Sequence, residues 1–512
     1  MKRLPFLLIA FFCQLPTAHC QADRRPLPQF LTDRLDAYVT RGLREWQIPG
    51  CAVAVVKDGN IVLAKGYGLR ELGQPDRVDE NTLFLIGSNT KAFTATALAM
   101  LEAEGKLSLN DPVTKHLPDF KLHDACATQQ ATLTDLLCHR LGLRTFQGDF
   151  TYWTSTLSRR QVMQKFGLNV PPYGFRTRYG YCNAGFLTAG EVVPVAGGTS
   201  WEAFIREKIF KPLRMTRALA LSAEMPAAEN KAASHTWVDG KLLKLSYPTI
   251  DNLAPAGSIA ASAREHAHWL LMQLDTGKFE GNQVIPKAAI LKTWMPQTIV
   301  NTNKSSLLPN QFGLYGLGWF VQDYAGRRVI THDGGVDGFV TSTCFLPEER
   351  LGILVFTNTD ANAFYTALRL QILDAFLNQP YRNYHEIFLK NHRQEDRRER
   401  ERLAALRAEA ARQPTPALPL AAYAGRYENP VYGFTEIKPE NGALVLQFEH
   451  HPSLRTVLQP LGENRFLAAY PNPTMGTHPL PFKVENGKVV SMEVKVNDFV
   501  EYGSYAFKKS EP

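Results

Sequence analysis

The sequence lacks the features that mark several large classes of protein. No pair of its seven cysteines has C-x-x-C spacing, so a zinc site of the usual kind is not indicated. No long Lys/Arg tract concentrates the net charge of +8, which leaves nucleic-acid binding unsupported. Beyond residue 20, no apolar run is long enough for a transmembrane helix. The G-x-S-x-G turn of α/β-hydrolases is also absent, which removes the main support for that fold.

Length and composition indicate a folded protein of more than one domain. A chain of 512 residues exceeds the usual size of one domain. A content of 45% hydrophobic and 21% charged residues is typical of a globular protein with a sizeable core. The mild positive charge suggests at most a general preference for anionic surfaces.

The N-terminus has the layout of a secretory signal peptide. Lys2 and Arg3 precede the apolar run LPFLLIAFF, and small residues follow up to Cys20. We therefore expect residues 1–20 to be removed and the mature protein to be exported to the periplasm or the extracellular space. A lipoprotein with its lipid on Cys20 is the alternative, although His19 before that cysteine fits it poorly.

Neither the cysteines nor the histidines indicate a metal site or a cofactor. Of the cysteines left after signal removal, Cys126 and Cys138 are candidates for a disulfide, but buried free thiols are the interpretation that we prefer. The tandem His450-His451 has no Asp, Glu or His partner at ligand spacing. We expect both of these histidines to lie at the surface.

Three segments of different composition follow the N-terminus. Residues 24–385 begin with two apolar strands joined at Asp58-Gly59, continue with mixed helices and strands, and end in the helical pattern LRLQILDAFLN. Residues 386–416 carry many charges of both signs and predict an exposed helix or connector. Residues 417–512 alternate short apolar strands with turns, which predicts a small β-barrel or curved sheet.

A lysine lies in the first turn of an expected apolar helix, IGSNTKAFTATALAMLEAEG at residues 86–105. Burying an ammonium group is costly unless it is paired or deprotonated. Ser88 lies three residues before Lys91, so the two share one face of the helix. A lysine whose pKa is lowered by burial and by the helix N-terminus can accept the proton of a serine hydroxyl and make it a nucleophile. The motif has only two fixed positions, so its meaning depends on the rest of the chain.

Two later stretches supply the other elements that an S-x-x-K serine enzyme needs. RYGYCNAGF contains Tyr181 and Asn183, a polar set suited to lining a cleft. VITHDGGVDGF contains His332 followed by Gly334 and Gly335, where glycines allow a substrate to approach closely. The three elements occur in the order that such enzymes use.

Together these motifs resemble those of the serine β-lactamase and penicillin-binding superfamily, in the branch of class C β-lactamases, D-aminopeptidases and related esterases. The resemblance covers roughly residues 30–380 and includes IPGCAVAVVKDGNIVLAKGYG, LTDLLCHRLGL, APAGSIAASAREHAHWL and YGLGWFV. It implies an α/β (α+β) β-lactamase/transpeptidase-like fold, with an antiparallel sheet flanked by helices. A helical subdomain between Ser88 and roughly residue 250 would meet this sheet at the active cleft. The tail from YAGRYENPVYGF onwards resembles the lipocalin-like β domain of some exported members.

The resemblance also implies a role for each residue of the reacting group. Ser88 would be the acylated nucleophile, and Lys91 the buried amine that relays its proton. Tyr181 matches the family tyrosine that acts as general base and later as acid for the leaving group. The division of the proton between Lys91 and Tyr181 stays open, because the two titrate as one coupled unit.

The remaining motif residues would bind the substrate. Asn183 would hydrogen-bond to Lys91 and to a substrate carbonyl. The backbone N–H groups of Ser88 and Gly335 would form the oxyanion hole, whose donors must be fixed before charge develops. His332 and Gly334 would line the site beside them.

One departure from the family pattern concerns the substrate. Class C β-lactamases carry Lys-Thr-Gly where this chain has His332-Asp333-Gly334. A lysine offers a permanent cation to a substrate carboxylate, whereas a histidine with a pKa near ~6.5 offers a weaker, pH-dependent one. Asp333 would discourage an anion further. We therefore expect a D-residue peptide or an ester, of cell-wall origin for example, rather than a β-lactam.

Three functions remain open from the sequence. The favoured one is an exported serine hydrolase that forms an acyl-enzyme with a small-molecule or peptide amide or ester. The second is a weak β-lactamase or a carboxylesterase, and the third is a penicillin-recognising or cell-wall-binding protein without useful turnover. The complete Ser–Lys–Tyr set favours an enzyme. The C-terminal domain would either cover the cleft or drive oligomerisation.

Overall fold

The computed structural model describes residues 26–302 and 305–510. The expected signal peptide and Cys20 lie outside these residues. Among the helices of the described chain, none has the length and apolar character that crossing a membrane requires. Within the same residues, no group of three or more His, Cys, Asp or Glu side chains is arranged to hold a metal ion.

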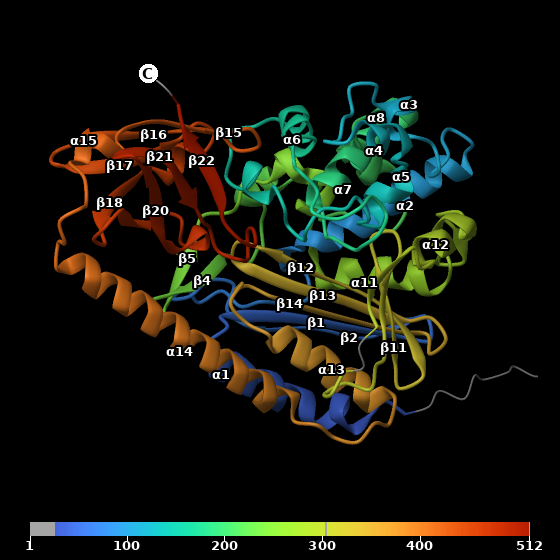
Figure 1. Cartoon of the computed structure of the whole chain (residues 1–512). Coiled ribbons are helices and arrows are strands. Elements are labelled where there is room, and N and C mark those ends of the chain that lie inside the picture. The colour runs from blue at the N-terminus through green and yellow to red at the C-terminus, as the bar shows by residue number, and fades with distance from the viewer. Residues whose placement is uncertain (1–25, 303–304, 511–512) are drawn as a thin grey trace, which may run out of the picture.

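An antiparallel sheet of eight strands forms the centre of the larger domain (Figure 1). The expected hairpin at Asp58-Gly59 joins the first two strands in the chain, and this prediction is confirmed. In order across the sheet, the strands are β2 (Asn60–Gly68), β1 (Gly50–Lys57), β14 (Leu351–Thr357), β13 (Phe339–Leu346), β12 (Arg327–Val336), β11 (Phe320–Tyr324), β10 (Gly313–Tyr315) and β9 (Thr298–Asn301).

Helices cover both faces of this sheet, which explains why β1 has no polar side chain from Gly50 to Val56. Successive side chains of a strand point to opposite faces. The odd-numbered residues from Cys51 to Val55 pack in the core that contains α1 (Leu35–Trp46) and α13 (Phe364–Phe376). The even-numbered residues pack in the core that contains α11 (Ala263–Leu274).

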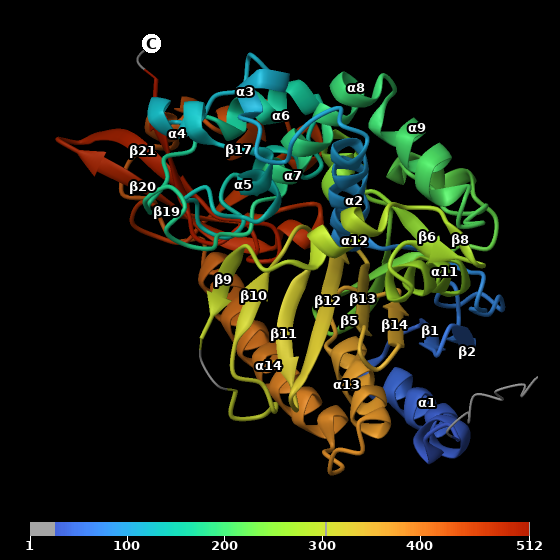
Figure 2. The same ribbon diagram turned by 90° about the vertical axis from the view of Figure 1, so that its right-hand side faces the viewer.

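A helical subdomain lies beside one end of the sheet (Figure 2). Its central helix, α2 (Thr90–Ala103), is buried at every residue from Thr90 to Leu101, as its apolar sequence predicted. The other helices of this region are α3 (Val113–His116), α4 (Ala125–Gln130), α5 (Leu133–Leu137), α6 (Arg159–Phe166), α7 (Asn183–Gly190), α8 (Val192–Gly197), α9 (Trp201–Ile205), α10 (Ala254–Gly257) and α12 (Lys287–Trp294). Three short hairpins or strand pairs connect it to the rest: β3 (Leu83–Leu85) with β6 (Ala260–Ser262), β4 (Ser234–Val238) with β5 (Lys241–Leu245), and β7 (Lys278–Phe279) with β8 (Asn282–Gln283).

A long helix, α14 (Tyr384–Ala411), runs along the outside of the larger domain to the C-terminal domain (Figure 1). Near its start the ring of His392 packs on Trp46, with the ring centroids 5.0 Å apart. Near its end Ala410 packs against Leu461 and Leu467 of the C-terminal domain. The charged segment seen in the sequence is therefore a helix in contact with both domains.

The C-terminal domain is a closed antiparallel barrel, as the alternating strand pattern predicted. After the short α15 (Leu420–Tyr423), each strand pairs with the next and the last pairs with the first. Aromatic rings such as Tyr427, Phe466 and Phe482 pack together among its buried residues. The strands are β15 (Gly425–Asn429), β16 (Gly433–Glu440), β17 (Ala443–Phe448), β18 (Thr456–Pro460), β19 (Arg465–Ala469), β20 (Thr477–Glu485), β21 (Lys488–Val494) and β22 (Tyr505–Lys509).

Candidate active site

A cavity of about 860 Å³ is lined by residues of the sheet, the helical subdomain and the barrel domain. This volume lies in the range of small-molecule sites in proteins. Aromatic side chains make up much of its wall, with β12 on one side and the turn before α2 at its base. The sequence-predicted residues that line the cavity are Ser88, Tyr181, Asn183, His332, Gly334 and Gly335.

Ser88 lies in a tight turn that precedes α2. The turn spans Gly87–Asn89, and Gly87 has a φ of +53°. A Cβ atom at position 87 would lie 2.9 Å from the backbone nitrogen of Gly335 on β12. Glycine is therefore required at 87, because the turn needs both the left-handed conformation and the close approach to β12. This approach brings the backbone N–H of Gly335 next to the Ser88 turn.

Lys91 lies beneath Ser88 and has no exposed surface. Its Nζ atom is 2.6 Å from Asn183 Oδ1, 2.8 Å from the carbonyl oxygen of Ala256 and 3.0 Å from Ser88 Oγ. Asn183 Oδ1 and the Ala256 carbonyl are acceptors and take two N–H groups of the lysine. In the neutral amine the remaining lone pair is then left for the hydroxyl of Ser88.

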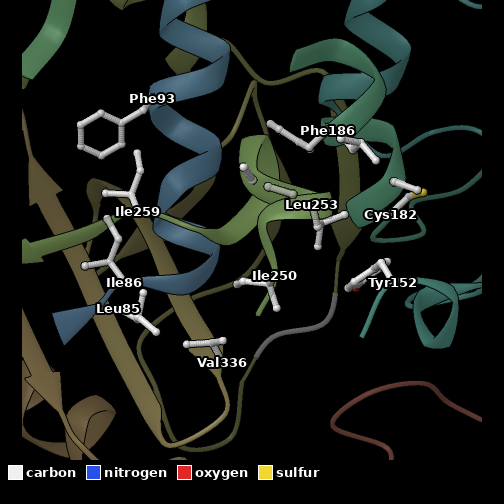
Figure 3. Close-up of a cluster of buried hydrophobic side chains, with 14 of the residues drawn as sticks. Leu85, Ile86, Phe93, Tyr152, Cys182, Phe186, Ile250, Leu253, Ile259 and Val336 are labelled. Atoms are coloured by element: carbon white, nitrogen blue, oxygen red, sulfur yellow. The ribbon is translucent and has the colours of Figure 1, made fainter. Parts of the chain in front are cut away.

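Burial lowers the pKa of Lys91 to about 7, although the charge of the more distant Asp149 acts in the opposite direction. The cause is the apolar surroundings of the first turns of α2, which disfavour the charged form. Figure 3 shows a cluster of buried apolar side chains in this region, which includes Ile86, Phe93, Phe186, Leu253 and Ile259. The ring of Phe186 lies 5.5 Å from Lys91 Nζ. The depressed pKa is the state that the sequence predicted for this lysine.

Tyr181 lies beside the Ser88–Lys91 pair. The Nζ atom of Lys91 is 4.8 Å from the centre of the tyrosine ring, and Tyr181 and Ser88 both line the cavity. Burial raises the pKa of Tyr181 far above its usual value, and the nearby Ser88 side chain only partly opposes this. The ring packs on His139, whose Nδ1 accepts the backbone N–H of Cys182. Tyr181 is therefore a fixed, protonated phenol at neutral pH.

Asn183 is held in one orientation by a buried acid. Its Nδ2 donates to Asp149 Oδ2 at 2.6 Å and lies 3.0 Å from the hydroxyl of Tyr152. Because Nδ2 must face the carboxylate, Oδ1 must face Lys91. Asp149 is 1% exposed, and burial raises its pKa to about 7. Sequence reasoning missed Asp149, which lies in a loop without a recognisable motif.

Glycine at position 334 is a packing requirement of β12. A Cβ atom there would lie 1.9 Å from the carbonyl oxygen of Ile86, just before the Ser88 turn. Any larger residue would push the strand away from the turn. Gly334 thus sets the distance between Ser88 and Gly335, the two residues whose N–H groups were predicted to form an oxyanion hole.

His332 lines the cavity as a neutral ring. Burial lowers its pKa to about 3. Its Nδ1 lies 2.6 Å from the backbone oxygen of Asp333 and therefore carries the proton, so Nε2 accepts the hydroxyl of Tyr315 at 3.1 Å. The pH-dependent cation expected at this position is therefore wrong, because the ring is buried and both of its nitrogens are occupied.

Asp333 is neutralised by a residue that sequence reasoning missed. Its carboxylate accepts a hydrogen bond from Arg369 of α13, and Arg369 also donates to Ser342 and Thr331. The pair forms part of the cavity wall. Asp333 therefore acts as the partner of a buried cation, rather than as the free anion that the sequence suggested.

The barrel domain borders the cleft, which is one of the two roles expected for it, while oligomerisation through this domain stays a prediction. Phe499 and Tyr502 of this domain line the cavity. The Phe499 ring packs edge-on against Trp153 at 5.6 Å, and a Cβ atom on Gly335 would lie 3.2 Å from it. Tyr502 packs on Phe146 at 5.3 Å. The substrate space is thus bounded by both domains.

The prediction that His450-His451 lies at the surface is wrong for His451, which is 1% exposed. Its ring stacks on Phe150 at 4.1 Å, and its Nε2 bonds to the carbonyl oxygen of the same residue. The reason is the contact between the two domains, which no local pattern reveals. The preferred interpretation of the cysteines is confirmed, since the described cysteines are free, although Cys126 is exposed.

Comparisons with known proteins agree with this architecture. A family model described as "Beta-lactamase" matches residues 35–376, and one described as a domain of unknown function (DUF3471) matches residues 409–509. An unguisins hydrolase of Aspergillus campestris is 30% identical over 422 residues, which cover 77% of this chain and 75% of that protein.

Two solved structures share the fold. The octameric penicillin-binding protein homologue from Pyrococcus abyssi superposes with a TM-score of 0.60 at 21% identity, covering 93% of this chain and 100% of that chain. A D-stereospecific amidohydrolase from Streptomyces has a TM-score of 0.52 at 21% identity, covering 63% of this chain and 94% of that chain.

Proposed function

Because the chain belongs to the β-lactamase family, a family of hydrolases, we propose that it is a serine hydrolase that works through an acyl-enzyme on Ser88. The observation that carries the proposal is the 3.0 Å contact between Ser88 Oγ and the Nζ atom of Lys91, a buried amine with a pKa of about 7. A base with its pKa near the working pH is the efficient partner for a hydroxyl nucleophile.

Acylation follows from this arrangement. Lys91 Nζ accepts the proton of Ser88 as Oγ attacks the substrate carbonyl carbon. The new C–O bond places negative charge on the carbonyl oxygen, which the N–H groups of Ser88 and Gly335 stabilise. The bond to the leaving nitrogen or oxygen then breaks, and that atom receives the proton through Tyr181. A water molecule attacks the resulting ester in the reverse sequence.

Tyr181 is a proton relay in this scheme, and Lys91 is the base. A phenol whose pKa lies far above its usual value holds its proton at neutral pH, whereas an amine with a pKa of about 7 is largely free to accept one. Tyr181 and Ser88 line the same cavity, which supports the phenol as the group that protonates the departing atom.

The substrate that we propose is an amide or ester with an uncharged, apolar acyl part, such as a D-residue peptide. The cavity wall is rich in aromatic rings, and its buried cation, Arg369, is already paired with Asp333. A carboxylate-bearing β-lactam would find a neutral ring at His332. The name of an unguisins hydrolase supports hydrolysis, and that of a D-stereospecific amidohydrolase supports an amide as the bond that is cleaved. An apolar cavity favours carboxylesterase activity as the second candidate.

Three substrates assayed side by side test this proposal: a D-alanyl p-nitroanilide, a p-nitrophenyl ester and nitrocefin. We expect turnover of the anilide or the ester to exceed that of nitrocefin. Ser88→Ala should abolish it, whereas Ser258→Ala, which removes a buried hydroxyl bonded to the carbonyl of Ala220, should not. Turnover that survives Ser88→Ala would contradict the proposal. Stoichiometric labelling by a penicillin without turnover would favour a penicillin-recognising protein instead.

We also propose that the protein is exported and meets its substrate outside the cytoplasm. The support is the sequence pattern of residues 1–20. Mass spectrometry of the protein produced with its own N-terminus should find a chain that begins at or just after Cys20. An uncleaved chain that starts at Met1 would contradict export through this signal.

A further inference from the structure

A buried carboxylate of the barrel domain, Glu501, is bonded directly to the helical subdomain. Glu501 is 3% exposed and follows the cavity-lining Phe499 by two residues. Its oxygens accept the backbone N–H groups of Gly148 at 2.8 Å and of Phe150 at 3.1 Å. The hydroxyl of Tyr432, on the barrel side, donates to the same carboxylate. A buried carboxylate that accepts three hydrogen bonds, two of them from the helical subdomain, is a specific contact between the two domains.

The two amides that Glu501 holds flank Asp149. The Asp149 carboxylate accepts Asn183 Nδ2 at 2.6 Å, and Asn183 Oδ1 accepts the Lys91 amine at 2.6 Å. Glu501 reaches Asp149 through the backbone of the turn that it holds, and the steps from Asp149 to Asn183 and from Asn183 to Lys91 are direct hydrogen bonds between buried groups. The series therefore connects the barrel domain to the lysine that lies 3.0 Å from Ser88 Oγ.

We propose that Glu501 is a positioning residue of the active site: it fixes the Gly148–Phe150 turn from the barrel domain, so that Asp149 orients Asn183 and Asn183 orients Lys91. The inference rests on the proposed function. It gives the barrel domain a part in the chemistry, in addition to its part in bounding the cavity.

The negative charge of Glu501 favours the amine form of Lys91, in addition to the positioning by its hydrogen bonds. Burial raises the pKa of Glu501, and the two backbone N–H donors and the phenol oppose this rise by favouring the ionised form. Its charge opposes ionisation of the neighbouring Asp149, whose pKa burial already raises. An ionised Asp149 would in turn raise the pKa of Lys91. Glu501 thus helps to keep Asp149 protonated and Lys91 in the amine form that accepts a proton.

The other titratable groups that face this series do not change charge near neutral pH. Burial raises the pKa of the surrounding phenols and of the thiol, and lowers that of the three imidazoles. These groups are Tyr152, Tyr181, Tyr432, Tyr505, Cys182, His139, His332 and His451. A change in the pH profile after substitution of Glu501 therefore reports on Asp149 and Lys91.

Glu501→Gln tests the inference, because it removes the charge and keeps an acceptor oxygen. The readouts are the rate of Ser88 labelling by a fluorophosphonate and kcat/KM for a p-nitrophenyl ester, each between about pH 5.5 and about pH 9.5. We expect the acid limb of both pH profiles to move to higher pH by roughly half a pH unit to one pH unit. This shift lowers the rates at about pH 6.5 by ~3- to 10-fold. Rates near pH 9 should stay within about twofold of the wild type.

Glu265→Gln is the matched control. Glu265 is also a buried acid, 6% exposed, that accepts a backbone N–H at 2.9 Å, from Arg217, but it does not line the cavity. Its substitution should leave the pH profile unchanged. If Glu501→Gln lowers the rate equally at every pH, or not at all, the positioning role is wrong.

A milder variant covers the case in which Glu501→Gln does not fold. Tyr432→Phe removes one of the three donors to Glu501 and should move the acid limb in the same direction by a smaller amount. No movement would overturn the inference. Activity or labelling that persists in Ser88→Ala would instead overturn the proposed function, so the two failures are distinct.

Discussion

Lys91 and Arg369 are buried cationic side chains at one cavity, yet their surroundings give them opposite charge states. Lys91 contacts a hydroxyl, an amide oxygen and a backbone carbonyl, and burial lowers its pKa to about 7. Arg369 has Asp333 as a partner. Burial acts to lower the pKa of Arg369, but the charge and hydrogen bond of Asp333, together with Cys344 and Tyr365, raise it overall. Burial without a carboxylate partner thus produces a base, whereas burial with one produces a fixed ion pair.

The largest expected effect comes from replacing Lys91 with an arginine, whose side chain carries a permanent charge as that of Arg369 does. Lys91→Arg should lower kcat/KM for a p-nitrophenyl ester by about 10³-fold or more, because a guanidinium cannot accept the proton of Ser88. Steady-state kinetics at pH 8 and the folded state by circular dichroism are the measurements. Activity within about tenfold of the wild type would show that Lys91 is not the base.

The second effect concerns the free energy of unfolding, which depends on pH because the folded protein keeps Lys91 neutral. Its pKa is about 7 in the folded protein and 10.5 in the unfolded chain, so the unfolded state binds more protons between these values. The free energy of unfolding should therefore rise with pH in the wild type relative to Lys91→Met, by of the order of 3 kcal/mol between about pH 7 and about pH 10.

Urea unfolding of both proteins at several pH values measures this difference. Lys278→Met, at an exposed lysine, is the control in which the difference should stay constant. A Lys91→Met difference that does not change with pH would mean that the folded protein holds Lys91 in its charged form.

The third effect comes from breaking the ion pair. Asp333→Asn leaves Arg369 buried without its counter-charge and should lower the free energy of unfolding by roughly 2 kcal/mol. This is less than for a fully buried pair, because the Asp333 side chain is 39% exposed. At the surface pair Arg328–Glu348, Glu348→Gln should cost about 1 kcal/mol or less. Equal effects at both sites would contradict the comparison.

The smallest effect is a gain of function in the same Asp333→Asn variant. Freed from its carboxylate, Arg369 offers a positive charge to the cavity that it lines. The ratio of kcat/KM for nitrocefin, which carries a carboxylate, to that for a neutral ester should rise about fivefold at low salt and less at high salt. An unchanged ratio would mean that the charge of Arg369 does not reach the substrate.

The fold and the grouping of Ser88, Lys91 and Tyr181 at one site could be predicted because their signals in the sequence are local. The apolar run around Lys91 reports burial, and its spacing from Ser88 reports a shared helix face. The alternation of short strands after residue 417 reports the barrel. Such patterns lie within one element, so the sequence alone carries them.

The residues that sequence reasoning missed depend on contacts between distant segments. Arg369 meets Asp333 across the sheet, and Glu501 meets the Asp149 turn across two domains. The pKa of His332 falls because the folded chain encloses it, which the residue type does not reveal. His451 is buried for the same reason, since its partner Phe150 lies 301 positions earlier in the chain.

The length of α14 has a consequence for how this architecture can vary. An α-helix turns by about 100° and advances about 1.5 Å per residue. Adding or deleting one residue in α14 would therefore rotate and shift the barrel domain relative to the larger domain. Phe499 and Tyr502 would then move away from the cavity that they line, and Glu501 would lose its bonds to the turn that carries Asp149. A change in the length of one solvent-facing helix would thus alter both the space beside Ser88 and the support of the residues around Lys91, without a substitution in either.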